Sequence, residues 1–137
     1  MVQNKEKNQR YTKVPYIEIP SLKISKLIEN DASQESLDKY TVAIWNKEKD
    51  LSKVHHLILA GHNVKTVFGP LHRIQIGDFI YIYYKDQKNV YEVVRKIEIK
   101  ITETEYLEET TEKYLSLVTC TDNNQTRLLV DAKIKEP

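Results

Sequence analysis

Three residues whose side chains can together perform acyl transfer lie near the ends of predicted β-strands. Cys120, the only cysteine, follows the apolar run Leu115–Thr119, and Arg127 begins the next apolar run after a short loop. His62 follows a further apolar run and Gly61. A thiolate can attack a carbonyl, an imidazole can carry protons, and a guanidinium can hydrogen-bond a developing oxyanion. A lone cysteine is more often a buried apolar residue, so position and composition alone leave catalysis open.

The elements that must position these residues have a β-strand pattern. Short runs rich in β-branched and aromatic residues alternate with polar turns, which predicts about eight strands and one or two short helices. The predicted strands are residues 16–19, 22–28, 40–45, 56–60, 79–84, 90–101, 115–119 and 127–134, and helical turns are predicted at 33–39 and 68–74. Because closing a sheet removes its exposed edges, we expect a mainly β fold in the form of a closed barrel.

Composition narrows the class of protein further. The 137 residues fit one domain, and 40% hydrophobic with 30% charged residues is typical of a globular chain. Its 21 basic and 20 acidic residues give a net charge of +1, which argues against nucleic-acid binding. No apolar run approaches the roughly 20 residues that cross a membrane. We expect residues 1–14 to form a flexible tail or linker and residues 15–137 to form the domain.

The residues around the three candidates resemble the signature of the sortase family, the cysteine transpeptidases of Gram-positive cell surfaces. The matching segments are Leu59–His62, Leu117–Cys120 and Arg127–Val130, and they occur in the order and context that the family has. Further matches occur at residues 17–20, 68–71 and 77–82. The resemblance therefore extends over residues 15–135, which is nearly the whole domain.

Two features depart from the family pattern. Ser116 replaces the first threonine of the family's Thr-Leu-x-Thr-Cys run, and residues 29–60 contain no glycine where the family often has a glycine-rich stretch. The separation of His62 and Cys120 leaves little room for the long helical insertion of class B sortases. The connection from Thr102 to Tyr114 is more similar to that of class A or class D.

The resemblance implies the eight-stranded sortase barrel and assigns roles to the candidate residues. Cys120 is then the nucleophile, His62 the general acid and base, and Arg127 the residue that positions substrate and stabilises the oxyanion. Thr119 and Ala60, next to these residues in the signature, are expected to bind substrate. The family cleaves a sorting signal of the Leu-Pro-x-Thr-Gly (LPXTG) type between Thr and Gly and holds the product as a thioester.

The family then passes the acyl group to an amine of a cell-wall precursor or a pilin. One thiol serves both half-reactions, so no cofactor is expected. The resemblance also implies a location on the extracellular face of the cell membrane, with an anchoring N-terminal segment outside this chain. A cysteine peptidase that uses water as acceptor, and a non-catalytic peptide-binding barrel, stay open as alternatives.

The remaining chemistry-bearing residues have simpler interpretations. We expect His55 and His56 to be surface residues at the start of a strand and His72 to be a solvated turn residue. A zinc site is disfavoured because the paired cysteine or histidine motifs typical of such sites are absent. We expect Trp45 in the barrel core, with lining of the substrate groove as the alternative.

Two connections are expected to form the walls of the groove, by analogy with the family. They are the loop Thr121–Thr126 and the acidic connection Thr102–Tyr114, which we also expect to carry substrate specificity. Some class A sortases bind calcium through acidic residues, and the candidates here are Glu48, Asp50 and the pair Glu108–Glu109. A solvated acidic face is the alternative, because hard-cation sites need several oxygens aimed at one point.

Overall fold

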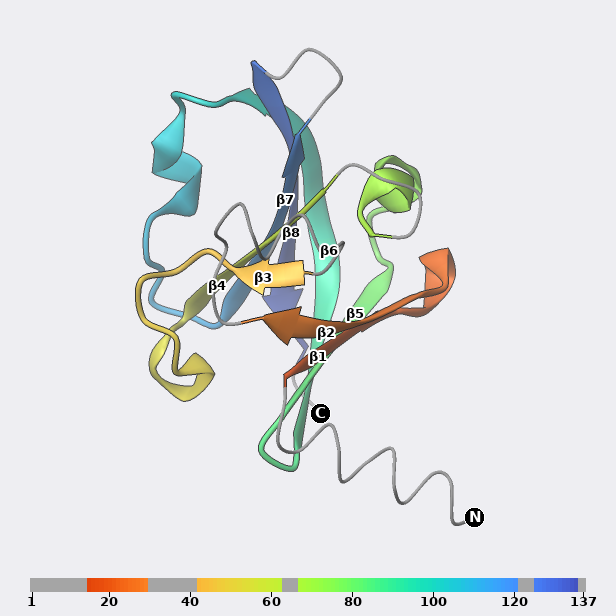
Figure 1. Ribbon diagram of the computed structural model, residues 1–137, viewed down its shortest axis with the longest axis vertical. Helices are drawn as coiled ribbons and strands as arrows, with labels where there is room; N and C mark the ends of the chain where they lie inside the picture. The colour runs from red at the N-terminus through yellow and green to blue at the C-terminus, as the bar shows by residue number, and fades with distance from the viewer. Residues whose placement is uncertain (1–14, 30–41, 63–66, 121–124, 136–137) are drawn as a thin grey trace.

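The computed structural model describes residues 15–29, 42–62, 67–120 and 125–135, which form eight strands and four short 3₁₀ helices (Figure 1). The strands are β1 (Tyr16–Ile19), β2 (Ile24–Glu29), β3 (Val42–Ile44), β4 (His56–Gly61), β5 (Phe79–Tyr84), β6 (Gln87–Lys100), β7 (Tyr114–Cys120) and β8 (Thr126–Ile134). The 3₁₀ helices are η1 (Pro20–Leu22), η2 (Leu51–Lys53), η3 (Gly69–Arg73) and η4 (Thr104–Leu107). The predicted tail at 1–14 and the predicted helical turn at 33–39 lie outside the described residues.

The strands close into a barrel in the order β1-β2-β3-β4-β7-β8-β6-β5, which confirms the predicted fold class. Strand β4 pairs with β7 in parallel, whereas β8 pairs antiparallel with both β7 and β6. The predicted boundaries of β1 and β5 agree with the structure, and the predicted turn at 68–74 contains η3. No helix in the described part of the chain is long and apolar enough to span a membrane.

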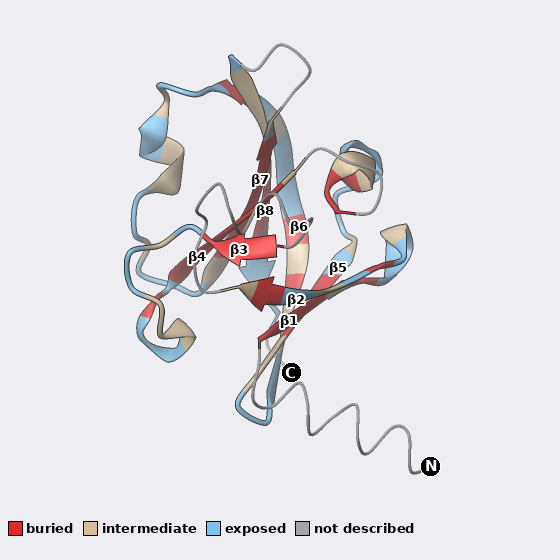
Figure 2. Cartoon of the chain, in the orientation of Figure 1, coloured by how far each residue is buried: buried red, intermediate tan, exposed pale blue. Residues whose placement is uncertain are grey.

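Strand alternation gives the barrel wall two apolar faces. Leu57 and Leu59 of β4 belong to the main core inside the barrel, whereas Ile58, between them, belongs to a second cluster outside it. That outer cluster consists of Ile58, Ile99, Val118 and Leu129, against which Ile97, Tyr106 and Leu107 pack. All six residues of β4 are buried, as the nearly continuous apolar run predicts (Figure 2). The 101–113 segment, which contains η4, therefore covers an outer face of the barrel.

Strand β4 ends at a glycine because the end of the barrel is tightly filled there. A Cβ atom on Gly61 would lie 2.7 Å from Cδ2 of Phe68 and 3.0 Å from Cγ1 of Val67. Phe68 is completely buried, and its backbone N–H donates to the carbonyl of His62 at 3.0 Å. The chain thus reverses directly after β4, and Phe68 fills the space beneath Gly61. This reversal fixes the backbone of His62 at the barrel rim.

Candidate active site

The strand register brings the three predicted catalytic residues to one end of three adjacent strands. The last registered pair of the parallel strands β4 and β7 is Ala60 with Val118, and His62 and Cys120 each come two residues later. In the antiparallel pair β7 and β8, Cys120 is directly opposite Arg127. A histidine, a cysteine and an arginine therefore meet at the same edge of the barrel wall.

His62 lies at the rim in a partly desolvated position. Its side chain is half-buried and its Nε2 atom is shielded from solvent. The hydrogen bond from Phe68 to the carbonyl of His62 holds the backbone at this point. Because charge interactions are stronger away from bulk water, such a position suits a group that exchanges protons with a reacting partner.

The guanidinium of Arg127 stacks on Trp45. The guanidinium carbon lies 5.4 Å from the centroid of the indole ring, within cation–π range. Trp45 is 43% exposed, so the prediction that it belongs to the core is wrong. Val42 and Ile44 occupy the inward positions of β3, and alternation turns the next residue outward. The groove-lining alternative agrees with this position, because the indole lies beside a predicted catalytic residue.

The outer apolar cluster and Ala60 form the floor next to these residues. Ala60 is 5% exposed and pairs with Val118 of that cluster, so it lies on the face where substrate binding was predicted. Thr119 is buried, and alternation with Leu115 and Leu117 turns its side chain into the barrel. Its Oγ1 atom has no hydrogen-bond partner among the described residues. The structure thus places Ala60, and not the side chain of Thr119, on the floor.

One wall beside this floor is the 101–113 segment. Tyr106 and Leu107 of η4 pack on the outer cluster, and the guanidinium of Arg95 lies 5.1 Å from the centroid of the Tyr106 ring. Figure 1 shows this segment running along one side of the barrel between the ends of β6 and β7. The connection is a loop with a single 3₁₀ turn, which agrees with the short connection predicted from the sequence. The other predicted wall, Thr121–Thr126, lies mostly outside the described residues.

His56 is buried and not a surface residue, so this prediction is wrong. It is 2% exposed because the 101–113 segment covers the start of β4. Its ring nitrogens contact the carbonyl of Glu108 at 2.5 Å and the hydroxyl of Ser116 at 2.7 Å. His55 is exposed as predicted, and so is His72, whose Nδ1 lies 2.8 Å from the Gly69 carbonyl.

Sequence analysis missed a buried polar chain beside the floor. Asp131, which is completely buried, accepts a hydrogen bond from the hydroxyl of Ser116 at 2.5 Å and pairs with Arg95. The hydrogen bond to Asp131 raises the pKa of the Arg95 guanidinium. The available signal was a single carboxylate inside the apolar run Leu128–Ala132, since a buried charge requires a partner.

The acidic residues considered for calcium accept hydrogen bonds from different parts of the chain. Asp50 accepts hydrogen bonds from the N–H and hydroxyl of Ser52 at 3.0 and 2.6 Å, which lower the pKa of its carboxyl. Glu109 accepts from the N–H of His56 at 2.7 Å, and this bond lowers the pKa of the Glu109 carboxyl. Among the described residues, no three His, Cys, Asp or Glu side chains converge in a way that suits a metal ion.

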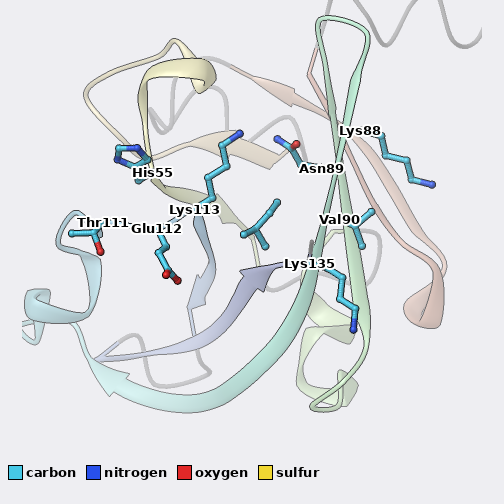
Figure 3. Close-up of a pocket in the computed structure, with 9 residues that line it drawn as sticks. His55, Lys88, Asn89, Val90, Thr111, Glu112, Lys113 and Lys135 are labelled. Carbon is cyan, nitrogen blue, oxygen red and sulfur yellow. The ribbon is translucent and has the colours of Figure 1, made fainter. Parts of the chain in front are cut away.

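A hollow of about 860 Å³ lies at the opposite end of β4 and β7, away from Cys120 (Figure 3). It is lined by His55, Lys88, Asn89, Val90, Thr111, Glu112, Lys113, Ile134 and Lys135. Figure 3 shows the ammonium groups of Lys88, Lys113 and Lys135 pointing in different directions. Lys135 also pairs with Glu92 at 3.0 Å. The hollow has no cysteine and its ammonium groups do not converge, so we place the candidate site at the barrel rim.

Comparison with known proteins agrees with this geometry. A protein-family model described as "Sortase domain" matches residues 17–135. No curated protein matches the chain significantly. A lid mutant of sortase A from Corynebacterium diphtheriae superposes with a TM-score of 0.81 and 23% identity, covering 90% of this chain and 70% of that one.

Two further solved structures share the fold. Sortase C from Streptococcus pneumoniae has a TM-score of 0.82 and 22% identity, covering 93% of this chain and 70% of that one. A sortase D5 transpeptidase from Clostridium perfringens has a TM-score of 0.81 and 22% identity, covering 99% of this chain and 89% of that one. With the family match extending over nearly all of the barrel, the chain belongs to the sortase family of cysteine transpeptidases.

Proposed function

We propose that this sortase cleaves an LPXTG-type sorting signal between Thr and Gly and transfers the acyl group to an amine. The observation that carries the proposal is the register that brings the ends of β4 and β7 together and sets Cys120 opposite Arg127. Sortases act at the cell surface of Gram-positive bacteria, so we propose surface proteins as substrates and a cell-wall precursor or a pilin as acceptor. The proposed catalytic residues are His62, Cys120 and Arg127.

In the first half-reaction, the thiolate of Cys120 attacks the Thr carbonyl carbon of the Thr-Gly bond. The carbonyl oxygen gains the charge, and the guanidinium of Arg127 hydrogen-bonds to it. The C–N bond then breaks, and His62 donates its proton to the leaving glycine amine. The products are a free amine and a thioester between the Thr carbonyl and Cys120.

In the second half-reaction, an incoming amine attacks the thioester carbonyl. His62 accepts the proton that the amine loses, and the C–S bond breaks to regenerate the thiolate of Cys120. No group outside the chain is needed to balance either step, which supports the proposal that the enzyme works without a cofactor. The apolar floor and the 101–113 wall favour acyl transfer over hydrolysis by keeping water from the thioester.

The subclass is proposed as D-like. The similarity to the sortase D5 structure extends over 99% of this chain and 89% of that one, whereas 70% of the sortase A lid mutant and of the Streptococcus pneumoniae sortase C is covered. The loop between β6 and β7, with one 3₁₀ turn, is also short. A general anchoring enzyme and a pilin-polymerising enzyme differ in the acceptor amine, which the test below can identify.

Mass spectrometry of the protein mixed with an LPXTG-type peptide tests the proposal directly. We expect the mass of the acyl fragment to be added to the wild-type protein and to be absent from Cys120→Ala. Adding an amine such as triglycine should release the adduct as a new amide. Release only as the free acid, at every amine concentration, would instead favour the cysteine peptidase.

Substitutions of the other two residues separate their roles. His62→Ala and Arg127→Ala should each lower kcat/KM by roughly 100-fold or more, the range seen when a proton donor or an oxyanion donor is lost. Arg73→Ala is the matched control for Arg127, because Arg73 is exposed on η3. An Arg127 variant as active as the Arg73 variant would remove Arg127 from the mechanism.

A further inference from the structure

A chain of buried polar side chains connects the 101–113 segment to the barrel beneath it. His56 from β4, Ser116 from β7 and Asp131 from β8 are 2%, 0% and 0% exposed. The Nε2 atom of His56 lies 2.7 Å from the Ser116 hydroxyl, and that hydroxyl donates to Oδ1 of Asp131 at 2.5 Å. The serine stands between the histidine and the aspartate and is closed to substrate, so the chain is not a hydrolytic triad.

The far end of the chain is fixed by an arginine. Arg95 from β6 donates from Nε and Nη2 to Oδ2 of Asp131 at 2.8 and 2.5 Å. A guanidinium is always charged and has no acceptor atoms, so both contacts require an accepting oxygen on Asp131. With Arg95 on one oxygen and the hydroxyl of Ser116 on the other, Asp131 is held as a carboxylate.

The ring of His56 has a hydrogen-bond partner at each nitrogen. The carbonyl of Glu108, 2.5 Å from Nδ1, can only accept, so Nδ1 carries a hydrogen. Nε2 lies 2.7 Å from the hydroxyl of Ser116, which contacts Asp131 in turn. The ring therefore connects the 101–113 segment to the buried polar side chains of the barrel.

Further groups surround His56. Oε1 of Glu109 accepts from the backbone N–H of His56 at 2.7 Å, and Asp131 pairs with Arg95. From β7, the Tyr114 ring meets the imidazole edge-on at 5.3 Å, and burial raises the pKa of its phenol.

The outer ends of this cluster face solvent. His55, next to His56 on β4, is exposed, and its N–H lies 3.5 Å from Oε2 of Glu109. Lys133 of β8 pairs with Tyr114 in the register and is exposed. The ring of His56 is thus buried, whereas its neighbours His55 and Lys133 are exposed.

We propose that His56 is a positioning residue that holds the 101–113 wall on the outer face of the barrel. Two of its bonds reach that segment, one from ring Nδ1 to the Glu108 carbonyl and one from the backbone N–H to the Glu109 carboxylate. The neighbouring Tyr106 and Leu107 lie on the groove floor, so holding Glu108 and Glu109 also holds the part of the wall nearest the peptide.

The consequence is a wall that depends on one buried ring, and it rests on the proposed function for its effect on the peptide. Without the ring, the Glu108 carbonyl loses its partner at Nδ1 and the wall loosens. KM for the peptide should then rise while kcat changes little.

The first test needs no substrate. Nitrogen NMR of ¹⁵N-histidine-labelled protein reports whether each ring nitrogen carries a hydrogen, and His56→Gln identifies the His56 signals by their disappearance. We expect Nδ1 of His56 to carry a hydrogen, because its partner is the Glu108 carbonyl. A bare Nδ1 would overturn the inference.

The second test measures the wall and the reaction together. His56→Gln should speed amide hydrogen exchange in residues 104–110 and raise KM about tenfold with kcat nearly unchanged. Glu109→Ala, which removes a surface anchor and leaves the buried chain intact, should change exchange and KM in the same direction. His55→Gln is the matched control and should behave as wild type.

The alkylation rate of the Cys120 thiol shows whether a substitution has disturbed the barrel as a whole. Its alkylation by iodoacetamide, which needs no peptide groove, should be equal in wild type, His56→Gln and Glu109→Ala. Equal KM in His56→Gln and His55→Gln would overturn the inference. If the wild-type protein processes no peptide, the proposed function fails, and the NMR and hydrogen-exchange results still decide the role of His56.

Discussion

Replacing Gly61 with alanine tests why a glycine precedes the histidine at the end of β4. Gly61 is not among the described residues with positive φ, so the glycine provides space and not an unusual backbone conformation. The added methyl would lie 2.7 Å from Cδ2 of Phe68, a completely buried ring that cannot swing away. Overpacking of this kind costs about 1–3 kcal/mol, and replacing a strand glycine with alanine returns about 0.5–1 kcal/mol.

From the middle of each range, the net loss is about 1 kcal/mol, which corresponds to a fall in Tm of roughly 3–5 °C for a domain of this size. Activity should fall further than stability. Phe68 donates to the His62 carbonyl, so displacing the ring displaces the proposed general acid, and we expect kcat/KM to drop by about tenfold or more. Thermal unfolding and peptide turnover measure the two effects separately.

A double-mutant cycle with Phe68→Leu decides whether the ring is the cause. The smaller side chain makes room, so Gly61→Ala should cost about 1 kcal/mol less in that background. Gly77→Ala is the matched control: its φ of +98° makes alanine strained, but nothing lies within 4 Å of the new methyl. Its cost should be the same with either residue at position 68. Equal stability of Gly61→Ala and wild type, or no coupling to Phe68, would refute the reasoning.

Three further predictions concern the groove and the core. Trp45→Ala should lower kcat/KM about two- to fivefold, the equivalent of an exposed cation–π contact with Arg127, and leave Tm within a degree or two; an unchanged kcat/KM would show that the stack does not position the guanidinium. Leu129→Ala should cost about 2–5 kcal/mol in urea unfolding, because the side chain is completely buried in the outer cluster, and a cost under 1 kcal/mol would mean that this cluster is loosely packed. Burial raises the pKa of Tyr91 to about 12, above its unfolded value of 10.0. The contribution of the neutral phenol to the free energy of unfolding is therefore complete below pH 10 and is lost as the pH rises toward 12. Between pH 9 and pH 11 wild type should lose about 1 kcal/mol more than Tyr91→Phe, and equal losses would contradict a buried neutral phenol.

The sequence was sufficient to predict the barrel because each strand has its own local signal. The alternation of Ile97 and Ile99 with polar residues indicates which positions of that strand face an apolar layer, and so does the apolar run of β4. The signature residues supplied the positions of His62, Cys120 and Arg127, which the strand register then brings to one edge. What the local signals cannot show is that the barrel wall is covered on its outside as well as filled on its inside.

The mistaken and missed residues follow from that outer layer. His56 looked solvated because it begins a strand, but a segment some fifty residues away in the chain covers it. Trp45 looked like core because of its size, yet strand alternation turns it outward. Asp131 and Arg95 form their pair between two strands whose register includes an irregularity between Val93 and Arg95, which no local pattern predicts.

The parallel pairing of β4 with β7 has a consequence for the order of events during folding. The two strands are distant in the chain, with β5 and β6 between them. They can therefore pair only after β5 and β6 have been synthesised and the chain has returned to β4. β8, which provides Arg127, is made last of all. The proposed site at the barrel rim therefore assembles only when the last strand has joined the sheet, because His62, Cys120 and Arg127 lie at the ends of three different strands. Until then, the proposed nucleophile is not held beside its proposed partners.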